Sequence, residues 1–112
     1  MAAAKLIVIY PMPKDVDAFE RAYGNEHLPM AAPIFDAAGA TKAVLTKIDA
    51  APGTKALFHR IAEIHFPSLA VLNACAASQA GRDALADAAR ISNGGAPIVL
   101  IGSEDVVTFG AR

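Results

Sequence analysis

Alternating and clustered apolar positions along the chain predict four β-strands. The candidate strands are residues 5–10, 41–48, 57–66 and 97–109. The first reads KLIVIY and should end at Pro11, because proline has no N–H to donate to a neighbouring strand. A loop around Pro52-Gly53 separates the second strand from the third, and the fourth is expected to bulge or bend near Gly102.

Apolar residues at helical spacing predict a helix after the first strand. Its apolar stripe consists of Val16, Phe19, Ala22 and Tyr23. Asp15 is the candidate N-cap, because its carboxylate can accept from the first free N–H groups of the helix. Pro29 lacks an N–H and crowds the carbonyl four residues earlier, so this helix is expected to end or kink near His27. Residues 28–40 are then expected to form a short, broken segment.

Two more helices are predicted in the second half of the chain. Ser68 can cap a helix within residues 68–78, and Ser78 can cap another over residues 79–91. Cys75 lies among alanines in the first of these helices and is expected to be a small core residue.

The predicted order is strand, helical region, strand, and then the same again. This is the order of a ferredoxin-like βαββαβ fold of the α+β class, with a four-stranded antiparallel sheet and the helices on one face. No linker divides the 112 residues, so we expect a single domain over residues 1–112. The other sheet face would be uncovered in a chain that is 54% apolar. We therefore expect a homodimer in which two sheets pair face to face as a dimeric α+β barrel.

The third strand has two faces of different character. One face carries Phe58, Arg60, Ala62, Ile64 and Phe66. The other face carries His59, Ile61, Glu63 and His65. This second set is too polar for a dry core and too apolar for open water. We expect it to line a partly wet cavity inside the barrel, where it could bind a ligand.

Residues 10–31 (YPMPKDVDAFERAYGNEHLPMA) resemble the EthD family, named for ethyl tert-butyl ether degradation. Members share a helix that reads Phe-x-x-x-Tyr-x-x-x-His-x-Pro, which corresponds here to Phe19, Tyr23, His27 and Pro29. Further matching positions are Phe66, Ser68, Leu72, Asp87 and Gly102. The resemblance implies a dimeric α+β barrel, a fold that also serves lactone isomerases, polyketide cyclases and dehydratases, quinone-forming monooxygenases and haem-dependent enzymes. We expect Asp87 to anchor a loop or an arginine such as Arg60.

Phe19, Tyr23 and His27 are spaced four residues apart, which keeps them on one stripe of a helix. In one interpretation Phe19 and Tyr23 belong to the core, and His27 is a cation that complements the end of the helix dipole. In the other, Tyr23 and His27 lie at the mouth of the barrel cavity. His27 would then be a general acid or base, and Tyr23 would orient the substrate by a hydrogen bond.

Charge and cysteine content exclude several kinds of partner. The net charge is −1 and no cluster of lysine or arginine occurs, which argues against nucleic-acid binding. The apolar run at the start is too short for a signal peptide or a membrane span, so no membrane partner is expected. A single cysteine suits a reducing compartment, and we expect a cytoplasmic protein.

A metal or haem site could in principle use His59, Glu63 and His65. A catalytic zinc usually has three protein ligands, and the sequence contains neither a Cys-x-x-Cys nor a His-Glu-x-x-His pattern. No Gly-x-Gly-x-x-Gly pattern follows a strand, so a dinucleotide site is not indicated. We therefore expect no metal and no cofactor.

These observations favour a small-molecule-binding protein of the EthD type. The leading hypothesis is a cofactor-free enzyme that moves protons on a small apolar or aromatic metabolite, as an isomerase, dehydratase or cyclase does. Two alternatives stay open. One is a non-catalytic carrier that serves a neighbouring oxidoreductase, and the other is a cofactor-free monooxygenase.

Overall fold

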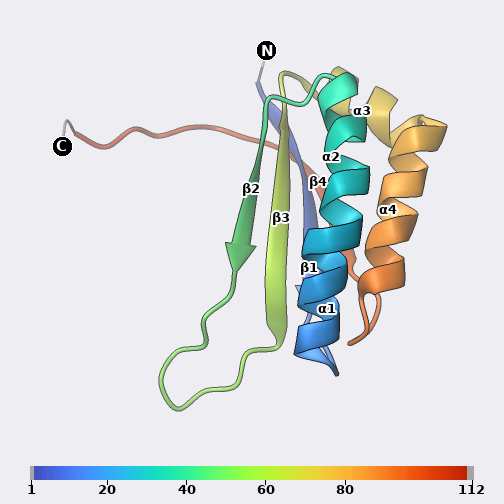
Figure 1. Cartoon of the computed structure of the whole chain (residues 1–112). Coiled ribbons are helices and arrows are strands. Elements are labelled where there is room, and N and C mark those ends of the chain that lie inside the picture. Colours follow the sequence, from blue (N-terminus) through green and yellow to red (C-terminus); the bar gives the residue numbers. More distant parts are fainter. Residues whose placement is uncertain (1, 111–112) are drawn as a thin grey trace.

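A four-stranded antiparallel sheet with helices on one face forms the domain (Figure 1). The computed structural model describes residues 2–110. The strands are β1 (Ala4–Pro11), β2 (Lys42–Lys47), β3 (Phe58–Phe66) and β4 (Ile98–Ser103). Their order across the sheet is β2-β3-β1-β4. This arrangement confirms the predicted α+β, ferredoxin-like fold.

The helices begin where the capping residues predict. They are α1 (Val16–Ala22), η1 (Tyr23–His27), α2 (Leu28–Ala37), α3 (Leu69–Ala77) and α4 (Gln79–Ile91). Asp15, Ser68 and Ser78 each accept a hydrogen bond from the backbone N–H three residues later, at 2.9, 3.2 and 3.0 Å. These bonds satisfy N–H groups that have no partner within the helix, and they confirm all three predicted caps.

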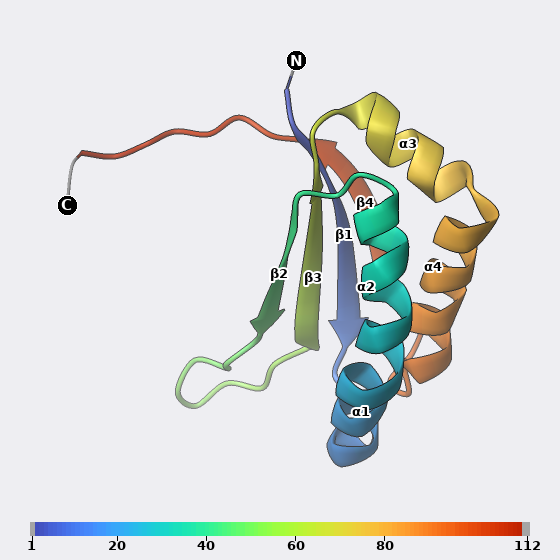
Figure 2. The ribbon, with the colours of Figure 1, turned by 45° about the horizontal axis from the view of Figure 1, so that its top comes forward.

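The first helix continues through Pro29, contrary to the prediction (Figure 2). Segment η1 is a π-helical turn, in which the N–H of Leu28 donates to the carbonyl of Tyr23, five residues back. Pro29 therefore falls in the first turn of α2, where a missing N–H costs little. The prediction that residues 28–40 form a broken segment is wrong for this reason.

The core lies between the helices and the covered face of the sheet. Its largest fully buried side chains are Tyr10, Phe19, Phe66, Leu6 and Leu72. Cys75 is buried beside them, as predicted. The alternate residues of β1 are only half-buried, because they face away from the helices.

We call the helix-free side of the sheet the open face. Its members include Lys5, Ile7, Ile9, Ile61, Glu63, His65, Ile98 and Leu100, together with Lys42, Val44 and Thr46 of β2, which the strand register places opposite one another. The four isoleucines, Leu100 and Val44 are large and apolar, so this part of the face resembles the inner face of a packed pair of sheets more than a solvated surface.

The last strand is shorter than predicted. β4 ends at Ser103, whereas the sequence pattern predicts a strand as far as residue 109. Residues 104–110 have no regular secondary structure and run away from the helices, as Figures 1 and 2 both show. We call these residues the arm.

Candidate functional site

An apolar cavity of about 200 Å³ lies between α2 and the covered face of the sheet. From the helix it is lined by Leu28, Ala31 and Phe35, and from the sheet by Leu45, Ala62 and Ile64. Two polar side chains also line it, those of Tyr23 and His27. A second hollow of about 210 Å³ adjoins it and shares Phe35 and Ile64. An apolar cavity with a few converging polar groups is the usual form of a small-molecule site.

The hydroxyl of Tyr23 is buried without a partner. The residue is 3% exposed, and no group among residues 2–110 accepts or donates a hydrogen bond at this oxygen. Burial raises the pKa of Tyr23, so the phenol stays protonated and can donate. A buried hydroxyl without a partner is unfavourable, and a ligand oxygen in the cavity would satisfy it.

His27 is held by Asp87 of helix α4. The residue is 7% exposed, and its Nδ1 lies 2.9 Å from Oδ2 of Asp87. A bond from Arg90 to the other carboxylate oxygen, at 2.7 Å, lowers the pKa of Asp87, and the bond with His27 adds to this effect. The carboxylate is therefore ionised at neutral pH and can only accept, so Nδ1 of His27 donates. In the neutral ring the lone pair then resides on Nε2, which has no hydrogen-bond partner among the described residues.

The π-helical turn presents Tyr23 and His27 to the same cavity. Because the turn closes over five residues, side chains four apart lie nearly one above the other. The two rings are almost parallel, with an interplanar angle of 18° and centroids 6.2 Å apart. Single π-helical turns occur frequently at functional sites.

The contact of Asp87 with His27 was not predicted from the sequence. Asp87 was expected to anchor a loop or an arginine such as Arg60. It does accept a hydrogen bond from an arginine, but from Arg90, whereas Arg60 donates to both oxygens of Glu20, at 2.7 and 3.2 Å. The pattern of buried positions along α4 contains a signal that Asp87 faces another helix. The buried positions of α4 are Gly81, Ala84, Ala88 and Ile91, and position 87 adjoins that stripe. An acidic residue beside an apolar stripe needs a buried partner.

Ile61, Glu63 and His65 lie on the open face, on the opposite side of the sheet from Tyr23 and His27. The expectation that both groups line one barrel cavity is therefore wrong. Glu63 accepts from Lys5 at 2.8 Å, so it belongs to a charged cluster and not to the cavity described above.

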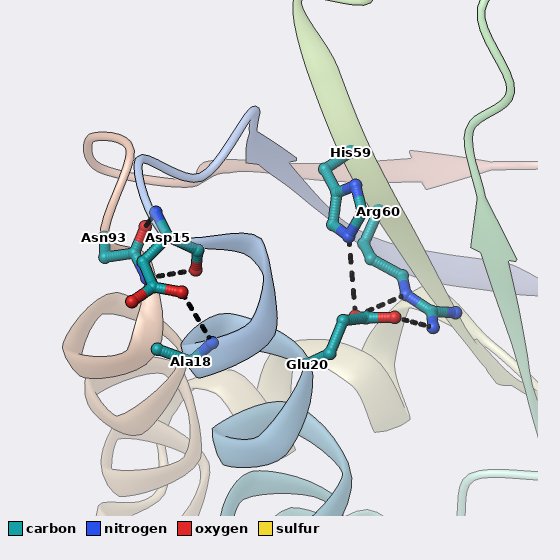
Figure 3. A network of polar contacts seen from close by, with 6 residues as sticks. All are labelled: Asp15, Ala18, Glu20, His59, Arg60 and Asn93. Carbon is teal, nitrogen blue, oxygen red and sulfur yellow. Dashed lines mark hydrogen bonds and ion pairs between the residues drawn. The ribbon is translucent and has the colours of Figure 1, made fainter.

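His59 also departs from its predicted place. The register of β1 and β3 shifts beside it, because Tyr10 pairs with Arg60 whereas Pro11 pairs with Phe58. This bulge turns His59 toward α1, where its ring lies edge-on to Phe19 with centroids 5.5 Å apart. Its Nε2 is 3.5 Å from a carboxylate oxygen of Glu20 (Figure 3). The prediction that His59 shares a face with Ile61, Glu63 and His65 is thus wrong.

The described residues contain neither a cluster of metal ligands nor a helix that could span a membrane. Within residues 2–110, no three histidine, cysteine or acidic side chains lie close enough together to hold a metal ion. No helix in the described part of the chain is long and apolar enough to cross a membrane.

Comparison with known proteins places the chain in a family. The model of the EthD domain matches residues 13–95. The chain belongs to the EthD family. This match includes Tyr23, His27 and Asp87, the three polar residues of the candidate site.

Relatives of this EthD-family protein have the same fold. An EthD family protein from Bacillus halodurans C-125 is 26% identical, with a TM-score of 0.81 over 92% of this chain and 99% of its own. An EthD-like protein from Ralstonia eutropha JMP134 is 20% identical, with a TM-score of 0.69 over 91% of each chain. An 11.0 kDa protein from the thcB-thcC intergenic region of Rhodococcus erythropolis is 26% identical over 92% of this chain and 97% of its own.

A more distant structure carries a description of its assembly. A protein from Jannaschia sp. CCS1, 15% identical with a TM-score of 0.65, is described as dimeric and ferredoxin-like. It covers 92% of this chain and 99% of its own. The likeness supports the fold of the EthD-family chain described above.

Proposed function

We propose that this EthD-family protein binds a small, mostly apolar molecule with a carbonyl or phenolic oxygen and transfers a proton on it. One observation carries the proposal: a carboxylate-bound imidazole and a buried phenol without a partner line the same apolar cavity. The pair offers a base and a hydrogen-bond donor to one ligand. These are the groups that an isomerisation, dehydration or cyclisation requires.

In the proposed reaction the hydroxyl of Tyr23 donates to the carbonyl oxygen of the ligand. The lone pair on Nε2 of His27 removes a proton from the adjacent carbon, and the electron pair moves onto the oxygen as an enolate. The carboxylate of Asp87 stabilises the imidazolium that forms. His27 then returns the proton at another position, which completes an isomerisation without an external oxidant or reductant.

The size of the cavity limits the ligand. An apolar cavity of about 150 Å³ in another protein accepts benzene. The cavity here is about 200 Å³, which suits one ring with a short substituent. Its walls are apolar apart from Tyr23 and His27. A multiply charged ligand would therefore lose its bound water and find too few polar groups to replace it.

The proposed mechanism uses side chains of the protein and needs no metal or cofactor. We also propose that the protein is a homodimer, with the open faces of two sheets in contact. The uncovered apolar face supports this, as does the description of the Jannaschia protein as dimeric. The partner would then cover Ile61, Glu63 and His65.

A carrier for a neighbouring oxidoreductase is the second candidate function. The small number of polar groups at the cavity favours it, since Tyr23 and His27 could simply hold an oxygen-bearing ligand. A cofactor-free monooxygenase is a third possibility, in which His27 would deprotonate a phenol. Proton exchange with solvent distinguishes an enzyme that transfers protons from a carrier that only binds its ligand.

Hydrogen–deuterium exchange tests the proposal without knowledge of the substrate. Cyclic and aromatic ketones of one ring would be incubated with the protein in D2O, and loss of the α-proton signal would be followed by NMR. We expect catalysed exchange that falls by about 10²- to 10⁴-fold in His27→Gln. Binding without exchange would favour the carrier. If neither these ketones nor single-ring phenols bind, the cavity is not a ligand site.

A further inference from the structure

We infer that the arm of one protomer, residues 104–110, packs onto a second copy of the chain and extends the contact made by the open face. The inference rests on the homodimer proposed above and is independent of the proposed proton transfer. Three features of the arm support it: its exposed apolar side chains, its fixed starting direction and its reach.

The arm exposes large apolar side chains to solvent. Val106, Val107 and Phe109 are 78%, 73% and 78% exposed. Three such residues within four positions would be unfavourable on a segment that stays in water. Valine, threonine and phenylalanine also favour extended backbone, so the segment suits pairing with another strand.

The start of the arm is fixed beside the open face. The N–H of Glu104 donates to the carbonyl of Ala3 at 3.0 Å. Its carboxylate lies 3.6 Å from Nδ1 of His65 and 3.8 Å from Nζ of Lys5, both of which belong to the open face. The arm therefore leaves the sheet on the side opposite the helices, and Figures 1 and 2 show it pointing away from its own domain.

The reach of the arm matches the width of the sheet. At about 3.3 Å per extended residue, residues 104–110 span about 20 Å. Four strands about 4.8 Å apart are about 15–20 Å wide. An arm of this length can reach from its own sheet to the edge of a second sheet that packs about 10 Å away. Because β2 is at the edge of the sheet, a second copy also offers an unpaired strand edge to the arm.

A double substitution within the arm tests the inference. Val107→Ser combined with Phe109→Ser removes the apolar side chains and leaves Glu104 in place. Leu57→Ser is the matched control, because Leu57 is 77% exposed but lies just before Phe58, at the end of the sheet opposite Ser103. The dimer dissociation constant of each protein would be measured by sedimentation equilibrium, with circular dichroism to verify the fold.

We expect the arm variant to raise the dissociation constant by at least about tenfold, which corresponds to about 1.4 kcal/mol. The control should stay within about twofold of the wild type. A dimer that is equally tight in the arm variant would overturn the inference about the arm and leave the homodimer standing. A wild-type monomer would overturn both. A loss of thermal stability that is independent of protein concentration would show that the arm folds onto its own domain, which also contradicts the inference.

Discussion

The imidazole of His27 and the carboxylate of Asp87 are joined by a hydrogen bond of 2.9 Å across a sequence separation of 60 positions. One group ends the π-helical turn, and the other lies on α4. The packing of these helices therefore determines which nitrogen of the imidazole carries the proton. This relationship leads to the first prediction below.

Asp87→Asn should change the tautomer of His27. An amide can donate to Nδ1, which removes the preference for a proton there and takes the lone pair from Nε2. We expect exchange activity to fall by about 10²- to 10⁴-fold, because His27 in the wrong tautomer cannot accept the proton at Nε2. Imidazole ¹⁵N chemical shifts should report the changed proton position. Unchanged shifts would contradict the assigned orientation.

Tyr23→Phe should weaken ligands that carry an oxygen and leave apolar ligands unaffected. The substitution removes a hydroxyl without a partner, so the protein should keep its stability or gain some. The binding free energies of phenol and benzene would be measured by NMR titration. In the variant, the advantage of phenol over benzene should shrink by about 0.5–1.5 kcal/mol. An equal loss for both ligands would indicate a change of cavity shape instead.

Phe19→Ala should destabilise the fold by about 3–5 kcal/mol, as measured by urea unfolding. Phe19 is almost fully buried, and its ring contacts those of Tyr10, Tyr23 and His59 at centroid distances of 5.1 to 5.5 Å. Val16→Ala, on the exposed side of the same helix, is the control and should cost less than about 1 kcal/mol.

Stability should fall as the pH drops below about 4.5, partly because of Glu20. Hydrogen bonds from Arg60 hold the pKa of Glu20 below its ordinary value of 4.5, and the nearby His59 adds to the effect. A lowered pKa in the folded state stabilises the fold above the unfolded pKa, and that stabilisation is lost as the pH falls through the lowered value. Glu20→Gln should flatten this part of the profile of unfolding free energy against pH. Asp17→Asn, which changes an exposed acid on the same helix, is the control.

Light scattering at micromolar concentration should report about twice the chain mass of 11.6 kDa. Leu100→Asp would place a charge on the open face and should yield a monomer, since an unpaired charge in an apolar interface is costly. Leu69→Asp is the matched control, because Leu69 has similar exposure but lies in the helical layer. A monomeric wild-type protein would contradict the proposal that two sheets pair through their open faces.

Local features of this fold are predictable from the sequence. Asp15, Ser68 and Ser78 cap their helices because each interaction involves residues only three positions apart. The effect of Pro29 was not predictable in this way, since a π-helical turn removes the conflict that proline would cause in a regular helix.

The remaining errors concern residues whose place depends on distant partners. His59 lies on the opposite face of the sheet from the predicted one, because the register of β1 and β3 shifts by one residue between Tyr10 and Pro11. Its own alternation pattern carries no trace of this bulge. The pairing of Asp87 with His27 depends on how α4 packs beside the first helix, and sequence spacing cannot show it.

The π-helical turn makes the length of this helix as important as its composition. Deleting one residue, such as Gly24, would restore regular helical bonding, because the π-helical turn holds one residue more than an α-helical turn. Tyr23 and His27 would then be three residues apart instead of four, which places their side chains about 60° apart around a regular helix. Among relatives that share the fold, the number of residues between this tyrosine and this histidine therefore decides whether the two rings can stack beside one cavity.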